Sequence, residues 1–427
     1  MMKINIAAFT ALFLVINVLF FGQDYTFNIP DAEAKKEALE LSGNLDVTYS
    51  LLKSRQTSPL YMLQNFNHLL PEILSSYGLI LYLNAEYQTE NIGFHIKTYQ
   101  EYFSDRLYDF NLFELYGNLN LSDNFFLLLG KKRYAWGKGY AFNPVGYINP
   151  VKDPENPELL QAGVLSVNFE YSLSFDMDFI RNMAFDFIAM PAESAVINKT
   201  FEPESTILAG KLYFLILDTD VDIMGYYGKN EPVKAGFDFS RNLLPNLEIH
   251  GECSWFYGQP RYNLSNNTSI IDKNMDLSYL IGIRWLSDWN VTAVFEYYHN
   301  DGGLTPEKFE IYYNFLINAS ISGNPINISN AASLNKKYFQ SSSLMWDYLY
   351  LKLSWPDPFN LLYFTPSLYT IFNLNDLSYV VGVPLSYKPF NNFEFNIIPV
   401  VFMGNTNSEF GMKQIESRAD IQISFYF

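Results

Sequence analysis

The last ten residues of the chain alternate strictly between apolar and polar side chains. One set of alternate positions holds Ala419, Ile421, Ile423, Phe425 and Phe427, and the other holds Arg418, Asp420, Gln422, Ser424 and Tyr426. Successive side chains of a β-strand point to opposite faces, so this pattern predicts a strand with one apolar and one polar face. The chain ends on this strand with an aromatic residue.

The same alternation recurs in about 18 segments along the chain, with residues 79–87, 165–173 and 247–255 among the clearest. A soluble β-sandwich would need more purely apolar strands to build a core of the required size. In a closed membrane barrel the apolar face meets lipid and the polar face lines a lumen. We therefore predict an all-β fold, a transmembrane antiparallel up-and-down β-barrel of about 18 strands, with 16 as the alternative.

The connections between the predicted strands alternate in length. Every long connection has the same parity, and these connections are residues 53–77, 133–163, 191–205, 257–276, 300–346 and 404–417. Short periplasmic turns and long extracellular loops are the asymmetry expected of such barrels. We expect the last strand to close the barrel against the first, near Asn44–Leu51. Arg418 would then lie near the outer rim and Phe427 at the periplasmic edge.

The amino-terminal region reads as a targeting segment followed by a short lead-in. Residues 1–22 combine Lys3 with an apolar core from Ile6 to Phe21, which predicts a secretory signal peptide. Residues 23–42 are predicted to form a short periplasmic lead-in, and residues 43–427 form the barrel. A signal peptide before a membrane barrel predicts location in the cell outer membrane of a diderm bacterium.

Composition agrees with a barrel and excludes several functions. Aromatic residues make up 18% of the chain and charged residues 17%, while mean hydropathy is near neutral because apolar and polar positions cancel. After the amino terminus, no apolar run is long enough for a membrane helix. The net charge of −17 argues against nucleic acid as a partner. Cys253 is the single cysteine, so no intramolecular disulfide can form.

Residues 130–139, with the sequence GKKRYAWGKG, concentrate four cations in an acidic protein. The segment does not match a phosphate-binding loop, because six residues rather than four separate Gly130 from Gly137 and Lys138. A basic cluster at a pore mouth or on an infolded loop can hold an anionic group or shape a constriction. The alternative is a solvated loop base whose cations pair with an acidic wall.

On the predicted lumen face, acidic residues outnumber basic ones. Rings of one charge sign select ions, so we expect a weak cation preference. The alternative is a lumen braced by cross-strand pairs, with no selectivity. The candidates for the pore mouth or constriction are Lys131, Lys132, Arg133, Lys138, Glu248, Glu252, Arg284 and Glu296.

Catalysis is not predicted. The four histidines, His68, His95, His250 and His299, lie far apart in sequence, and no serine has a GxSxG context. His299 and Asp301 are expected at an outer rim, where a simple hydrogen bond is favoured over an acid–base pair. No HExxH or paired-cysteine spacing is present, so no metal or other cofactor is predicted.

These features resemble those of bacterial outer-membrane porin-like β-barrels. Residues 130–139 and the hairpin through Trp285 to Gly303 are similar to segments of poorly characterised porin families and of carbohydrate- or alginate-export-type barrels. Lys131 departs from this pattern, which usually has arginine there. The terminal Ile421, Ile423, Phe425 and Phe427 look like the assembly signal that the barrel-insertion machinery reads. The resemblance implies fold and location, and says little about substrate.

The pattern and the resemblance together predict a porin-like channel for passive diffusion of small polar solutes. Residues 133–163 and 300–346 are the connections expected to narrow the lumen. The expected partners are outer-membrane lipid, the barrel-assembly machinery and a small polar solute, and the oligomeric state stays open. The alternative is a non-conducting barrel that anchors surface loops, as in an adhesin or an envelope-polymer-binding protein.

Overall fold

The computed structural model describes residues 38–66, 70–106, 108–191, 206–229, 231–264, 268–271 and 274–427. The predicted signal peptide, most of the predicted lead-in and His68 lie outside these residues. Almost all the described residues belong to one compact unit that begins at Leu39.

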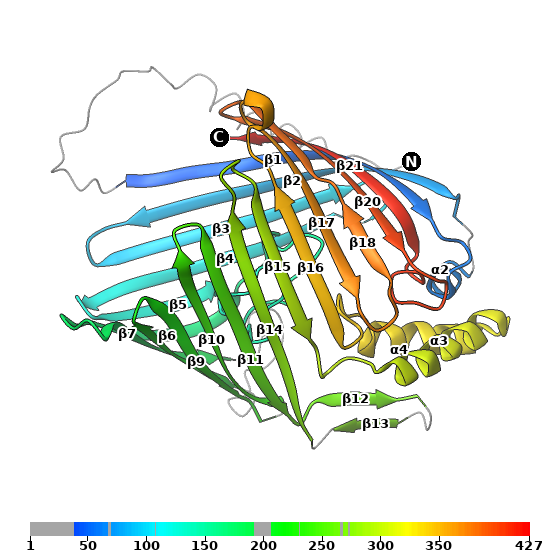
Figure 1. The fold of residues 1–427 in the computed structure, drawn as a ribbon, viewed down its shortest axis with the longest axis horizontal. Helices are drawn as coiled ribbons and strands as arrows, with labels where there is room; N and C mark the ends of the chain where they lie inside the picture. Colours follow the sequence, from blue (N-terminus) through cyan, green and yellow to red (C-terminus); the bar gives the residue numbers. More distant parts are fainter. Residues whose placement is uncertain are drawn as a thin grey trace. The chain divides into compact units, whose positions relative to one another are not determined.

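Eighteen antiparallel strands form the wall of this unit (Figure 1). Their bounds are β1 (Ala38–Ser54), β2 (Ile73–Gln88), β3 (Ile92–Phe103), β4 (Asp109–Ser122), β5 (Phe125–Lys132), β6 (Val164–Ser174), β7 (Ile180–Met190), β8 (Ile207–Ile216), β9 (Thr219–Tyr227), β10 (Val233–Leu244), β11 (Leu247–Tyr257), β14 (Met275–Leu286), β15 (Thr292–His299), β16 (Asp347–Ser354), β17 (Phe364–Asn373), β18 (Tyr379–Gly382) with β19 (Leu385–Phe390), β20 (Phe393–Met403) and β21 (Ile415–Tyr426). β18 and β19 are two halves of one strand, interrupted at Pro384, which has no N–H to donate to a ladder.

Each strand pairs with its neighbours in sequence, and β1 also pairs with β21 to close the barrel. In this closing pair Asn44 lies opposite Tyr426, and Leu51 lies opposite Ala419. The predicted fold, the count of 18 strands and the pairing of the last strand with the first are therefore confirmed. The first strand begins earlier than predicted, at Ala38, inside the range expected for the lead-in.

The alternation seen in the sequence separates the two faces of the wall. On β21, Ile421 and Ile423 are 44% and 39% exposed on the outer face, whereas Ser424 is 2% exposed. On β1, Val47, Tyr49 and Leu51 are also exposed. An exterior of apolar side chains with a polar interior is the arrangement of a barrel surrounded by lipid.

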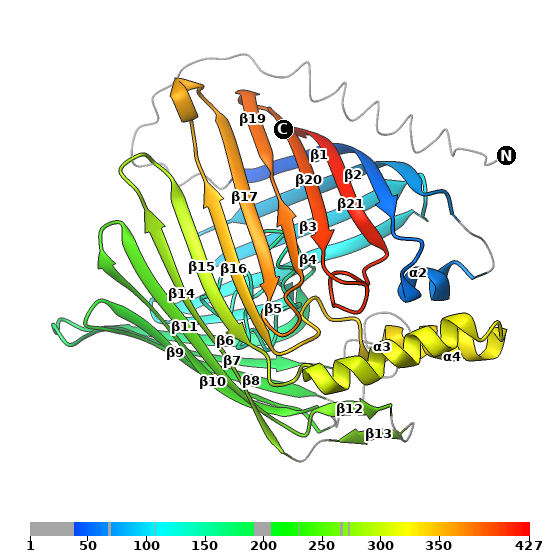
Figure 2. The same ribbon diagram turned by 45° about the vertical axis from the view of Figure 1, so that its right-hand side comes forward.

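The connections differ between the two ends of the barrel. At one end, the short-turn end, most connections have only a few residues, and the longest of them holds the short helix η3 (Pro358–Asn360). The opposite end, the long-connection end, carries α2 (Pro59–Gln64), α3 (Pro306–Ile321), α4 (Pro325–Tyr338) and the hairpin of β12 (Pro260–Asn263) and β13 (Thr268–Ile271) (Figure 2). The length alternation is as predicted from the sequence. Which end faces which compartment stays a prediction.

The strand pattern of the sequence marks residues 300–346 only as a long connection, whereas the structure has the helices α3 and α4 there. Local signals for α3 are present: Thr305 accepts a hydrogen bond from the Lys308 N–H, and Pro306 begins the helix. In the described part of the chain, none of the helices has the length and apolar character needed to cross a membrane.

The interior contains two apolar clusters. The first joins α2, α3, α4 and residues 404–414 to the inner faces of β14–β18 and β20, and its fully buried members include Leu316, Tyr348 and Val380. The second joins residues 133–163 to the inner faces of β7–β9. The barrel is therefore partly filled by its own long connections.

Candidate constriction site

The connection between β5 and β6, residues 133–163, runs inside the barrel, and we call it the infolded segment. Trp136, Val145 and Ile148 are buried against Ile188 on β7 and Met224 on β9. The segment therefore contacts wall strands that follow it in the sequence, rather than extending outward beyond β5 and β6.

Two glutamates on the wall bind the backbone of the infolded segment. Glu252 on β11 accepts hydrogen bonds from the N–H groups of Gly139 at 2.5 Å and Val145 at 3.2 Å. Glu296 on β15 accepts from the N–H groups of Tyr140 and Ala141, the latter at 2.8 Å. Buried backbone N–H groups require acceptors, and these two carboxylates supply four of them. This pairing fixes the height and register of the segment in the lumen.

Glycine is needed where the segment approaches the wall so closely. Gly137 has a φ of +95°, which side chains rarely adopt, and a Cβ there would lie 2.8 Å from Glu252 Oε1. A Cβ on Gly139 would lie 2.2 Å from the Phe142 carbonyl oxygen of the same segment and 2.9 Å from Leu280 Cδ1 on β14 of the wall. The glycines of residues 130–139 therefore serve close packing rather than phosphate binding.

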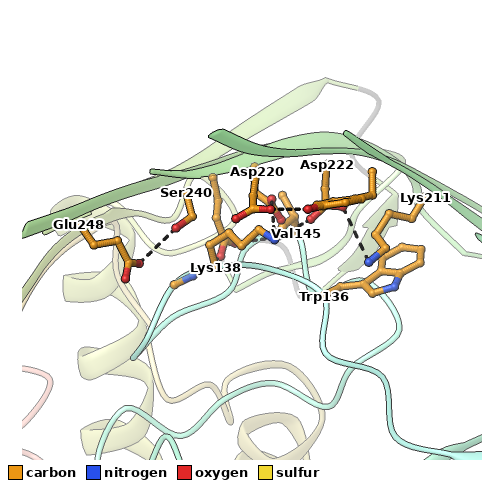
Figure 3. Close-up of polar contacts among 12 residues, drawn as sticks. Trp136, Lys138, Val145, Lys211, Asp220, Asp222, Ser240 and Glu248 are labelled. Atoms are coloured by element: carbon orange, nitrogen blue, oxygen red, sulfur yellow. Dashed lines mark hydrogen bonds and ion pairs between the residues drawn. The ribbon is translucent and has the colours of Figure 1, made fainter. Parts of the chain in front are cut away.

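Lys138 extends from the segment to an acidic pair on the wall. Its Nζ lies 2.9 Å from Asp222 Oδ2 on β9 and 4.0 Å from Asp238 Oδ1 on β10, and Lys211 lies on the other side of Asp222 (Figure 3). Burial lowers the pKa of Lys138, but the attraction of Asp222 and Asp238 outweighs burial and raises it above its usual value. Lys138 thus binds the segment to the wall as a charged group.

His250 is a site residue that the sequence analysis did not assign. It is buried on β11, with Nε2 3.0 Å from Glu296 Oε1 and Nδ1 3.6 Å from Glu248 Oε1. The signal was available, because positions 248, 250 and 252 share the inward face of one predicted strand.

A cavity of about 480 Å³ adjoins the infolded segment. Its lining includes Arg133, Trp136, Tyr140, Glu248, His250 and Arg284. Charged, hydroxyl and aromatic groups thus surround a space large enough for a small polar molecule together with water.

The structure brings most of the predicted constriction residues together. Arg133, Lys138, Glu248 and Arg284 line the cavity, and Glu252 and Glu296 hold the infolded segment. The four cations of residues 130–139 nevertheless do not form one cluster, because Lys131 and Lys132 point in different directions.

Lys132 and Lys131 lie on opposite faces of β5. Lys132 Nζ lies 5.5 Å and 5.8 Å from the ring centroids of Tyr116 and Tyr134. Lys131 pairs with Leu115, which is exposed on the outer face. The prediction that Lys131 belongs to the constriction is therefore wrong, because strand alternation turns it away from the lumen.

The rim histidine has a different partner from the one predicted. His299 Nδ1 lies 2.8 Å from Asp347 Oδ1, since the two residues are opposite each other on β15 and β16. Asp301 instead accepts a hydrogen bond from the Leu277 N–H at 2.8 Å. Among the described residues, no group of three or more acidic, histidine or cysteine side chains is arranged to hold a metal ion.

The residues of the predicted assembly signal lie on the closing strand. Ile421 and Ile423 face outward on β21, and the Phe427 N–H donates to the Gly43 carbonyl at the short-turn end. Recognition of these residues by an insertion machinery stays a prediction.

No protein-family model matches this chain, and no curated protein matches it in sequence. Solved structures do match it. OccK11 of Pseudomonas aeruginosa is similar with a TM-score of 0.53 and 7% identity, over 91% of this chain and 96% of that one. OccK2 of the same organism has a TM-score of 0.51 and 9% identity, over 92% and 98%.

Wzi of Escherichia coli is similar with a TM-score of 0.52 and 13% identity, over 90% of this chain and 84% of that one. Wzi is described as an outer-membrane protein involved in group 1 capsule assembly and as a carbohydrate-binding β-barrel. At these identities the likeness is one of fold. The chain has the fold of the outer-membrane porin-like β-barrels, as the resemblance predicted.

Proposed function

We propose that this protein is an outer-membrane channel through which small polar solutes diffuse passively, with the infolded segment as its constriction. The observation that carries the proposal is the binding of the segment backbone by Glu252 and Glu296 beside a polar cavity of about 480 Å³. Barrels of this strand number leave an aqueous lumen unless loops fill it.

The way the segment is held supports a narrowing rather than a closed plug. Its backbone N–H groups point to the wall, so the wall glutamates are used for attachment. Side chains of Arg133, Tyr140 and Arg284 border the adjoining cavity, where they can contact a passing solute. Pore-lining polar groups of this kind set selectivity in channels.

The weak cation preference predicted from the count of lumen charges depends on whether the lumen acids are free to interact with a solute. Glu252 and Glu296 accept loop N–H groups, and Asp222 is paired with lysines. Acids with such partners present less free charge to a solute than a count of residues implies. The sign of the selectivity therefore depends on the groups that border the cavity.

Planar-bilayer recording of the purified protein tests the channel. We expect discrete conductance steps, together with swelling of liposomes in solutions of small sugars. Insertion of a correctly folded barrel, verified by heat-modifiable migration in detergent gels, without any conductance step would contradict the proposal.

A second candidate function is a non-conducting barrel that binds an envelope polymer. The apolar cluster around α2, α3, α4 and residues 404–414 favours it, because this cluster occupies the long-connection end. The fold likeness to Wzi, a carbohydrate-binding barrel, is compatible with it. Replacing residues 306–338 with a short linker would then abolish polymer binding and leave ion conductance absent, whereas the channel proposal expects conductance in both proteins.

A further inference from the structure

The cationic side chains that border the cavity differ in whether they already have partners within the protein. Lys138 Nζ is paired with Asp222 at 2.9 Å, and Lys152 Nζ donates to the carbonyl oxygens of Gly139 and Tyr140. Both ammonium groups therefore act within the protein, as attachments of the infolded segment. Neither is available to bind a solute without releasing that segment.

Arg284 on β14 is exposed on the lumen side of the wall. It lies opposite Glu248 in the β11–β14 ladder, yet its guanidinium makes no ion pair within 4 Å across the described residues. Glu248 instead accepts a hydrogen bond from Ser240 at 3.2 Å and lies 3.6 Å from His250. The guanidinium of Arg284 keeps its donors free.

Arg133, the first residue of the infolded segment, also lines the cavity. Its backbone N–H donates to Glu114 Oε1 at 2.9 Å, while the other oxygen of that carboxylate lies 3.2 Å from His95. Within the described chain, the Arg133 guanidinium has no hydrogen bond or ion pair. Two unoccupied guanidinium groups thus border one cavity, whose nearby acids have other partners.

Building on the proposed channel function, we propose that this cavity binds a small solute through an oxyanion group, held by the guanidinium groups of Arg133 and Arg284. Guanidinium is planar and always charged, and its paired donors match carboxylate and phosphate oxygens. Tyr140 lines the same space, and its ring provides a contact for the body of the solute. The channel then prefers anionic solutes, opposite to the preference predicted from the count of lumen charges.

Glucuronate and glucose are the matched probes for this proposal, because they share a ring and differ in the carboxylate. Binding is measured by calorimetric titration of the full-length protein in detergent, with inorganic phosphate as a third probe. We expect glucuronate to bind at least about tenfold more tightly than glucose, since charge-assisted hydrogen bonds contribute roughly that factor or more. Phosphate binding distinguishes a general oxyanion site from one that also needs the sugar ring.

Substitutions of the two arginines test whether they form the binding site. R133Q and R284Q are each expected to weaken glucuronate binding about tenfold or more, and R284K is expected to keep part of it. R181Q is the control, because Arg181 is paired with Asp218 near a turn away from the cavity. Heat-modifiable migration verifies that each variant is a folded barrel. Equal binding of glucose and glucuronate, or unchanged binding in both R133Q and R284Q, overturns the proposal.

Binding in detergent does not require conduction, so the two proposals fail separately. Conductance steps without glucuronate or phosphate binding would contradict the oxyanion site and support the channel. Glucuronate binding that depends on both arginines, without conductance, would contradict the channel and support the oxyanion site. In a conducting protein, the reversal potential in a potassium chloride gradient is expected to shift toward cations in R133Q and R284Q.

Discussion

Two long connections partly fill this barrel, and they are held in different ways. The infolded segment packs against β7–β9, and it is also attached through hydrogen bonds and charge to Glu252, Glu296 and Asp222 on the wall. Residues 300–346, with α2 and residues 404–414, are held mainly by an apolar cluster in which Leu316 and Tyr312 are almost fully buried. Phe142 of the infolded segment belongs to the same apolar cluster, and its ring stacks on Tyr298 of the wall strand β15 with centroids 4.7 Å apart.

This difference separates the interactions that fix the position of a connection from those that mainly stabilise the folded barrel. Apolar packing is non-directional and contributes in proportion to the area buried. Hydrogen bonds to wall carboxylates require one register, since a shift leaves buried N–H groups without acceptors. We therefore infer that the infolded segment is positioned for solute passage, whereas the helical connection mainly occupies the long-connection end.

The largest effect is expected for Glu296→Ala. This change leaves the N–H groups of Tyr140 and Ala141 without acceptors and removes the hydrogen-bond partner of His250 Nε2. At about 1–3 kcal/mol for each unsatisfied group, the attachment of the segment should weaken by roughly 2–6 kcal/mol. Limited proteolysis should then cut within residues 133–163. Glu86→Ala, an inward-facing acid with half-exposed side chain, is the control and should leave the digestion pattern unchanged.

A comparable or slightly smaller effect is expected for Leu316→Ala in α3. Removing a fully buried leucine side chain costs roughly 2–5 kcal/mol, depending on how far the site collapses. Thermal unfolding of the long-connection end should begin at lower temperature, while the segment stays protected from protease. Ile321→Ala, on the exposed end of the same helix, is the control. Equal destabilisation by both substitutions would contradict the assigned packing.

Gly137→Ala should displace the segment without removing any hydrogen-bonding group. The left-handed backbone and the approach to Glu252 together predict a penalty of about 1–3 kcal/mol. Gly225→Ala is the matched control, because a Cβ at that position meets nothing within 4 Å. Protease sensitivity of residues 133–163 should rise in the first variant only, and a similar rise in both would refute the proposed close approach.

The smallest effect concerns pH and Lys138. The pKa of Lys138 is raised above 10.5 in the folded protein, so its contribution is complete below that pH and is lost as pH rises through the higher folded value. Protease protection of the segment should therefore decline at strongly alkaline pH in the natural protein. In Lys138→Met, this alkaline decline should be absent and protection weaker throughout. An identical pH profile in the two proteins would show that Lys138 does not hold the segment.

The strands and their closure could be predicted because their signal is local. Alternation along residues 418–427 is visible without knowledge of any contact. Every strand of the barrel has lipid on one face and the lumen on the other, so the same alternation recurs in each strand. The infolding could not be predicted in this way. It depends on hydrogen bonds between Gly139 and Glu252, 113 residues apart, and between Ala141 and Glu296, 155 residues apart.

The differences between prediction and structure also have physical causes. Lys131 is adjacent to Lys132 in sequence, but strand alternation places it on the opposite face of β5. His299 is close to Asp301 in sequence, but the ladder between β15 and β16 places Asp347 opposite it. A count of lumen charges does not show that Asp222, Glu252 and Glu296 already have partners within the protein.

The most direct test of the constriction is single-channel conductance of the natural protein and of the variant carrying both Glu252→Ala and Glu296→Ala, in the same bilayer and salt. Both proteins should show discrete steps, and release of the infolded segment should give the variant the larger unit conductance. Equal unit conductance in the two proteins, with the segment of the variant shown by proteolysis to be released, would contradict the role of residues 133–163 as the constriction.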